Sequence, residues 1–181
     1  MIHDPFWAET DKDFQKAWKQ MEAMKSEGKA KSIGVSNYLR PHLEATLATA
    51  ESPPVINQIE CQPYLQRAND FVPWMRQVGI EVEAFKGLCP LTKGKGGPLD
   101  SILVKMAEQH NVAPSAILLR WHMQQNVIAI TTTRKLERLE EYAKATTFVL
   151  SAEEIEQITQ VGKSHHFRAG YQKRFAPDDR T

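Results

Sequence analysis

The chain has 181 residues, 41% of them hydrophobic, so it is long enough for one domain with a sizeable core. Its net charge of +1 gives no electrostatic basis for binding nucleic acid or a membrane surface. No apolar stretch approaches the roughly 20 residues of a membrane span, and the N-terminus lacks a signal-peptide layout. Cys61 and Cys89 show no metal or redox spacing. We therefore expect a soluble, cytoplasmic protein with reduced thiols and no metal site.

The first part of the chain alternates strand-like segments with helical patterns. Residues 1–3 resemble the end of a strand, and residues 10–27 carry apolar side chains at helical spacing. Strands are predicted at residues 33–37 and 55–59, with a helix between them. This order is a βαβ unit, which implies a parallel sheet.

The alternation continues toward the C-terminus, where a capping box formed by Ser151 and Glu154 precedes the last helix. Residues 86–98 form a glycine-containing loop, and residues 163–181 a polar tail with aromatic side chains. The remaining predicted helices cover residues 68–79, 99–111, 114–124, 136–144 and 152–161, and the remaining strands cover residues 80–85 and 127–131. Pro73 lies inside the first of these helices, and a later start of its first turn is the alternative. No change in composition marks a domain boundary.

Polar side chains occur near the carboxyl ends of two predicted strands. Ser36 and Asn37 end the first, and Asn57 and Gln58 lie near the end of the second. Ligands of α/β folds bind at the carboxyl ends of parallel strands, so these residues are candidates for ligand contact. Small polar residues also end strands simply to start turns, and that alternative stays open.

Two segments together resemble the aldo-keto reductase family: Gly34-Val35-Ser36-Asn37 and Asn57-Gln58-Ile59-Glu60-Cys61-Gln62-Pro63-Tyr64. The resemblance covers essentially the whole chain. It implies an α/β fold, the (β/α)8 TIM barrel, and reduction of a small-molecule carbonyl by a nicotinamide dinucleotide, usually NADPH. Such a barrel needs eight strands and about 250 residues. We therefore expect residues 1–181 to be a single partial domain, a truncated barrel of about five βα units, and three more units to be encoded upstream.

The resemblance also implies catalytic residues. His3, before Asp4-Pro5, is similar to the family's strand-end histidine, which orients the carbonyl and assists proton donation. A neutral imidazole N–H can do this near pH 7. The alternative is a histidine without a role at the start of the chain. The family's proton donor is a tyrosine supported by a lysine and an aspartate, and no residue here matches these three positions.

Ser36, Asn37 and Gln58 match the family residues that hydrogen-bond the nicotinamide carboxamide, a group that suits hydroxyl and amide partners. Phe85 occupies the position of a tyrosine that stacks on the nicotinamide ring, and stacking needs only an aromatic face. An ordinary core aromatic is the alternative for Phe85.

The following loop departs from the family, which has serine, proline and leucine where this chain has Lys86-Gly87-Leu88. Lys86 is predicted either to contact a pyrophosphate as a point charge or to be solvated. Leu88 continues the family-like loop over the pyrophosphate. The tail at residues 167–175 aligns with the family's C-terminal substrate loop.

The adenosine end is also altered. Thr131-Thr132-Thr133 replaces the family's proline, lysine and serine, so Thr132 lacks the charge that meets the NADPH 2′-phosphate, and NADH becomes the second candidate. This version resembles a fungal-type branch that includes conjugated polyketone reductases. Arg138 and Glu141 match the family's adenosine-end pair, and an arginine fork suits a phosphate. The alternative for Arg138 is a surface pair with Glu141 or Tyr142.

Two functions of different classes follow. The first is an NAD(P)H-dependent carbonyl reductase, an enzyme acting on carbonyl and CH–OH groups. The second is a non-catalytic cofactor-binding or protein-interaction module derived from the same family. An unclosed barrel would leave strand edges unpaired, so self-association through these edges is also predicted.

Overall fold

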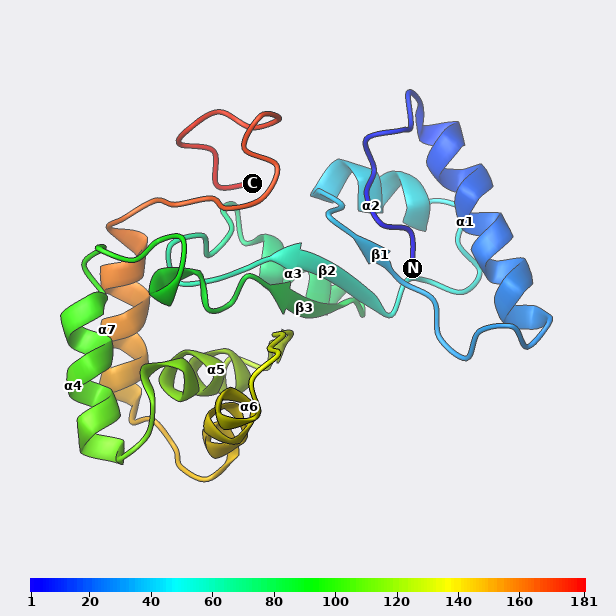
Figure 1. Cartoon of the computed structure of the whole chain (residues 1–181). Coiled ribbons are helices and arrows are strands. Elements are labelled where there is room, and N and C mark those ends of the chain that lie inside the picture. Colours follow the sequence, from blue (N-terminus) through cyan, green and yellow to red (C-terminus); the bar gives the residue numbers. More distant parts are fainter. The chain divides into compact units, whose positions relative to one another are not determined.

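The computed structural model describes all residues from Met1 to Thr181 (Figure 1). Contacts divide the chain into two compact units. Unit 1 comprises Met1–Ile59, Asn69–Glu83 and Thr181, and unit 2 comprises Glu60–Ala68 and Ala84–Arg180. Strands β2 and β3 contribute residues to both units.

Unit 1 is built from a βαβ arrangement, as predicted. β1 pairs in parallel with β2, Val35 opposite Asn57 and Ser36 opposite Gln58. Ile2 bridges to Val35, which confirms the predicted strand end at the N-terminus. Its elements are α1 (Asp11–Ser26), β1 (Val35–Ser36), α2 (Arg40–Leu47), α3 (Phe71–Gln77) and the first residues of β2 (Ile56–Glu60) and β3 (Glu81–Phe85).

The core of unit 1 is aromatic. Phe14 and Trp18 are the buried residues of α1, and the ring of Phe14 lies 5.5 Å from that of Tyr38. Leu43 from α2 is fully buried as well. Helices α1 and α2 pack against each other, and both residues of β1, Val35 and Ser36, are buried.

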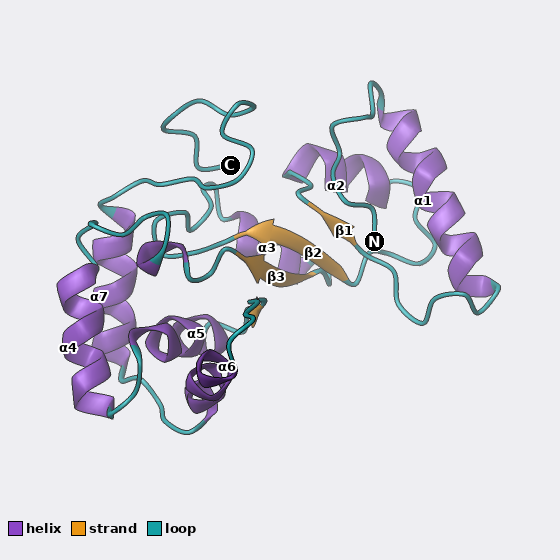
Figure 2. Ribbon diagram, in the orientation of Figure 1, coloured by secondary structure: helices purple, strands orange, loops and turns teal.

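Unit 2 contains the remaining helices, shown in Figure 2. Tyr64, Leu103, Trp121 and Ile158 belong to one cluster of buried side chains, which joins α4, α5 and α7. The predicted capping box is confirmed: Ser151 and Glu154 exchange hydrogen bonds at the start of α7. The elements are η1 (Cys89–Leu91), α4 (Asp100–His110), α5 (Pro114–Gln124), β4 (Ile128–Ala129), α6 (Leu136–Ala143), η2 (Lys144–Thr146) and α7 (Ala152–Lys163).

The hydrogen-bonded strand order is β1-β2-β3-β4. Two predicted strands are shorter than expected, since β1 and β4 contain two residues each. The helix predicted from residue 68 begins at Phe71, because Arg67, Asn69 and Asp70 all have positive φ angles that no α-helix accommodates. No helix is long and apolar enough to cross a membrane.

Candidate functional site

The three residues predicted to contact a carboxamide come together in unit 1, and we call them the amide cluster (Ser36, Asn37 and Gln58). The Ser36 hydroxyl donates to the main-chain oxygen of Gln58 at 2.7 Å, and the Asn37 amide donates to Ser36 Oγ at 3.0 Å. Gln58 Nε2 donates to the Glu83 carboxylate at 2.5 Å. These hydrogen bonds fix the cluster where the carboxyl end of β1 meets the middle of β2.

The chain turns at Asn37, directly after β1. Its φ angle of 60° is left-handed, a region that asparagine enters more readily than most residues. Its main-chain N–H still donates to Gln58 O at 2.9 Å, so the parallel pairing extends one residue beyond β1. The predicted turn role is thus realised at the same residue that was predicted to contact a ligand.

His3 is tied to the amide cluster through its backbone. Its main-chain oxygen accepts from Asn37 Nδ2 at 2.9 Å, while its side chain is 83% exposed and lies 3.6 Å from the Asp4 carboxylate. The imidazole is therefore open to a ligand from solvent.

Tyr38, which follows the amide cluster, has the wrong chemistry for a proton donor. Its side chain is buried, its hydroxyl has no hydrogen-bond partner, and burial together with the nearby Asp4 charge raises its pKa. A catalytic acid at neutral pH needs the opposite shift. Tyr38 is therefore unsuited to donate a proton near neutral pH.

Unit 2 brings most of the other predicted residues around one cavity of about 340 Å³. We call it the strand-end cavity, because it lies where β3 and β4 end. The predicted residues that line it are Phe85, Lys86, Leu88, Thr131, Thr132 and Arg138. Five further residues complete the lining: Gly87, Cys89, Thr92, Ile130 and Tyr142.

The strand-end cavity has an unbalanced positive charge. Lys86 and Arg138 line it, and its lining contains no aspartate or glutamate. Neither cation forms an ion pair in the structure, so the surface pair of Arg138 with Glu141 is not formed. The cavity therefore offers a cationic, aromatic-walled space that suits an anionic ligand.

Lys86 holds an unusual backbone conformation at this cavity. It directly follows β3, and its φ angle is 61°. A lysine in the left-handed region carries strain of about 1 kcal/mol or more and persists only where its surroundings fix it. Strain of this kind is common at ligand sites.

Two predicted residues lie outside the cavity lining. Thr133 Oγ1 instead accepts from the main-chain N–H of Lys135 at 3.1 Å, a local turn that precedes α6. Glu141 is half-buried on α6. The sequence reading missed Tyr142 as a cavity residue, although its spacing of four from Arg138 puts both on one helix face.

Gly87 was also missed, and its role is steric. A Cβ at this position would lie 3.0 Å from Cε1 of His122, a buried side chain of α5. A side chain at Gly87 would therefore require the His122 ring to move by a few tenths of an ångström.

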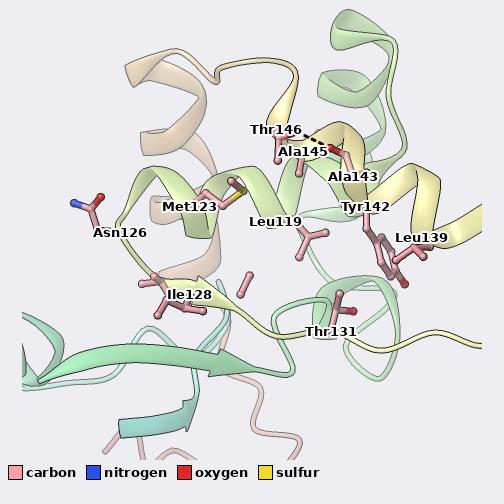
Figure 3. A pocket seen from close by; sticks show the side chains of 12 residues that line it. Leu119, Met123, Asn126, Ile128, Thr131, Leu139, Tyr142, Ala143, Ala145 and Thr146 are labelled. Atoms are coloured by element: carbon pink, nitrogen blue, oxygen red, sulfur yellow. Dashed lines mark hydrogen bonds between the residues drawn. The ribbon is translucent and has the colours of Figure 1, made fainter. Parts of the chain in front are cut away.

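A second cavity of unit 2, of about 700 Å³, is largely apolar, and we call it the apolar cavity (Figure 3). Leu119 and Met123 from α5, Leu139 from α6 and Ile128 from β4 border it. Leu139 is 57% exposed and Ile128 is 50% exposed. The apolar face of α6 is thus uncovered, and none of its residues is buried.

Comparison with known proteins decides the family. Residues 1–163 match the description "Aldo/keto reductase family". The chain belongs to this family. The resemblance seen in the two sequence segments is thereby confirmed.

Two fungal relatives align with most of the chain. The NAD/NADP-dependent indole-3-acetaldehyde reductase of Schizosaccharomyces pombe is 34% identical over 93% of this chain. The NADPH-dependent alpha-keto amide reductase of Saccharomyces cerevisiae is 33% identical over 91%. The chain spans 60% and 55% of these two proteins.

Solved structures agree on the fold. An aldo/keto reductase from Brucella melitensis is 30% identical, with a TM-score of 0.76 over 88% of this chain and 59% of its own. An aldo-keto reductase from a deep-sea metagenome library gives 0.82 over 97% of this chain and 63% of its own, at 24% identity. The predicted fold class, an α/β chain that forms part of a (β/α)8 barrel, is confirmed.

Proposed function

We propose that this chain carries the cofactor-binding part of an NAD(P)H-dependent reductase that converts small-molecule aldehydes or ketones to alcohols. The observation that carries the proposal is the strand-end cavity, whose lining contains Phe85, Lys86 and Arg138 and no aspartate or glutamate. Relatives named as NAD/NADP-dependent and NADPH-dependent reductases support it. NADPH is the first candidate cofactor and NADH the second.

The residues fit the groups of a nicotinamide dinucleotide. Phe85 offers an aromatic face, Lys86 and Arg138 offer charges for phosphates, and the Thr131 and Thr132 hydroxyls are exposed at the same cavity. The amide cluster offers the hydroxyl and amide groups that a carboxamide requires. When bound, the reduced nicotinamide supplies a hydride for the carbonyl carbon. His3 would orient the carbonyl oxygen through an imidazole N–H.

The role of Arg138 tests this proposal directly. Arg138→Ala should weaken NADPH binding about tenfold or more, because a lost charged hydrogen bond costs about 1.5–3 kcal/mol. NADH, which lacks the 2′-phosphate, should be affected much less. Arg40→Ala removes the same charge from an exposed side chain of α2 in unit 1 and is the matched control. Equal losses for both cofactors in a fluorescence titration would refute the assignment.

The alternative function is that of a non-catalytic module, and it applies to the 181-residue chain tested alone. No tyrosine matches the family's proton donor, so we expect cofactor binding without turnover. The measurement is NADPH oxidation with a reactive diketone, compared with a His3→Ala variant. Turnover clearly above that variant would show that the proton comes from a group other than the one missing here.

Self-association is the second part of the proposal, and the exposed apolar cavity favours it. β4 is the last strand of the sheet, and edge strands with apolar neighbours tend to pair with other chains. Leu139→Glu should lower the mass measured in solution. Val104→Glu, at a side chain of α4 that is 48% exposed, is the matched control and should change nothing. A monomeric parent chain would exclude this contact.

We place the protein in the cytoplasm. The buried thiols of Cys61 and Cys89 suit a reducing compartment. Imaging of a tagged full-length product would test the location.

A further inference from the structure

The C-terminal tail of unit 2 is held by one buried carboxylate. Glu60, the last residue of β2, is only 3% exposed. Its Oε1 accepts from the main-chain N–H of Ala169 at 2.7 Å, and its Oε2 accepts from that of Gly170 at 2.6 Å. Each carboxylate oxygen thus binds one of two consecutive amides, an arrangement that no neutral side chain reproduces.

Neighbouring contacts dock the same stretch of tail. Gln62 Nε2 donates to Phe167 O at 2.7 Å, and Phe167 N donates to Tyr64 O at 3.2 Å. Four hydrogen bonds therefore attach the segment from Phe167 to Gly170 to residues 60–64. The rest of the tail, drawn in red in Figure 1, contains no helix or strand. Hydrogen bonds to side chains must therefore hold the tail in place of the backbone ladder of a helix or strand.

Charge makes Glu60 the central member of this set. Two arginines lie near it, Arg67 half-buried and Arg168 buried. Loss of solvent lowers the pKa of Arg67 to about 10 and also lowers that of Arg168. The negative charges of Glu60 and Asp179 act in the opposite direction on both guanidinium groups. Arg168 also lies 4.0 Å over the ring of Phe175 and donates to Asp179 O at 3.1 Å. Loss of the Glu60 charge would remove one of the negative charges that offset these two cations.

The anchored tail touches a residue of the strand-end cavity. A Cβ added to Gly170 would lie 3.0 Å from Glu60 Oε2 and 3.5 Å from Phe85 Cε2. Gly170 therefore lies near both the Glu60 carboxylate and the Phe85 ring. A displaced tail would change the surroundings of that ring.

We propose that Glu60 is a positioning residue that holds the C-terminal tail against Phe85 and thereby fixes the orientation of this ring for a bound nicotinamide. The part that concerns Phe85 rests on the proposed function. The part that concerns the tail is independent of any cofactor. Glu60 touches neither ligand nor reacting atoms in this scheme, and acts through Gly170 and Phe85.

The first experiment measures hydrogen exchange at Ala169 and Gly170 in the full 181-residue chain. In Glu60→Gln, one acceptor oxygen becomes a donor nitrogen, so exchange at these amides should accelerate about tenfold or more. Glu83→Gln, the same change at the carboxylate that binds Gln58, is the matched control and should leave them protected. Unchanged protection in Glu60→Gln would overturn the anchor.

The second experiment separates positioning from general stability. NADPH affinity is measured for Glu60→Gln, Phe85→Leu and the double variant. If Glu60 acts through the ring, its substitution weakens binding in the parent chain but adds little once Phe85 is leucine. Additive losses would overturn the link to Phe85. Absence of NADPH binding in the parent chain would refute the proposed function, while the exchange experiment would still decide the anchor.

Discussion

Gly34 allows β1 to approach β2, and adding one methyl group there should disturb the amide cluster. In the structure, a Cβ at Gly34 would lie 2.5 Å from Ile56 Cγ2 and 2.9 Å from Ile56 O. Both atoms belong to a residue that β2 holds in place, and one of them is main chain. Gly34→Ala therefore requires the strands to move apart, two residues before Ser36.

Two opposing effects set the size of this change. Alanine reduces the entropy of the unfolded chain, which stabilises by about 0.4–1 kcal/mol where the backbone tolerates it. Overpacking a buried site destabilises by about 1–3 kcal/mol. The clash with main chain cannot be relieved by a rotamer change, so we expect a net loss of about 1–2 kcal/mol. Longer Ser36–Gln58 contacts should accompany it.

Urea unfolding followed by fluorescence of Trp18, a buried residue of unit 1, measures this loss in a variant whose other tryptophans are phenylalanine. Ile56→Ala removes Cγ2, so the double variant should lose less stability than the sum of the two single variants. Strict additivity, or a Gly34→Ala chain as stable as its parent, would contradict the proposed steric role of Gly34.

Three other perturbations have defined outcomes. Gly162→Ala should destabilise unit 2 by about 1–3 kcal/mol in urea unfolding, because its Cβ would lie 2.4 Å from Pro63 O; a stabilised variant would contradict this. Lys86→Gly should raise the free energy of unfolding by up to about 1 kcal/mol, because glycine adopts a left-handed backbone without strain. The same variant should bind NADPH more weakly in a titration. A variant that loses stability would show that the lysine side chain itself holds the loop. Burial lowers the pKa of the His122 imidazole in the folded chain. As the pH falls below about 6.5, the imidazole is protonated in the unfolded chain first. The free energy of unfolding should therefore decrease by up to about 1.4 kcal/mol per pH unit. His122→Gln should remove this component from urea curves measured at several pH values.

Local patterns in the sequence predicted the elements well where the determinants are local. Pro114 begins α5 as predicted, and the capping box of Ser151 and Glu154 begins α7. The start of α3 was wrong by three residues because the left-handed residues before Phe71, including Asp70, follow from the path of the preceding loop. Such a path is set by contacts distant in sequence.

The candidate site divides in the same way. The family motif identified Ser36, Asn37 and Gln58 as candidate ligand contacts, and each of them lies next to another member of the amide cluster. Glu60 belongs to the same motif, yet its partners lie 109 and 110 residues away and are main-chain groups. Main-chain donors carry no signature in the side-chain sequence, so no pattern of residue types predicts this anchor.

The turn and ligand interpretations, which the sequence left as alternatives, describe one geometry. Asn37 and Lys86 each follow a strand directly, and their φ angles are 60° and 61°. A left-handed residue ends the strand and begins the turn, and in a parallel sheet that point is the carboxyl edge where ligands bind. Asparagine enters this conformation at little cost, whereas lysine does so against about 1 kcal/mol or more. Turn formation alone would favour glycine or asparagine after β3. The lysine at that position, facing a cavity without acidic residues, is therefore better explained by its charge than by the turn.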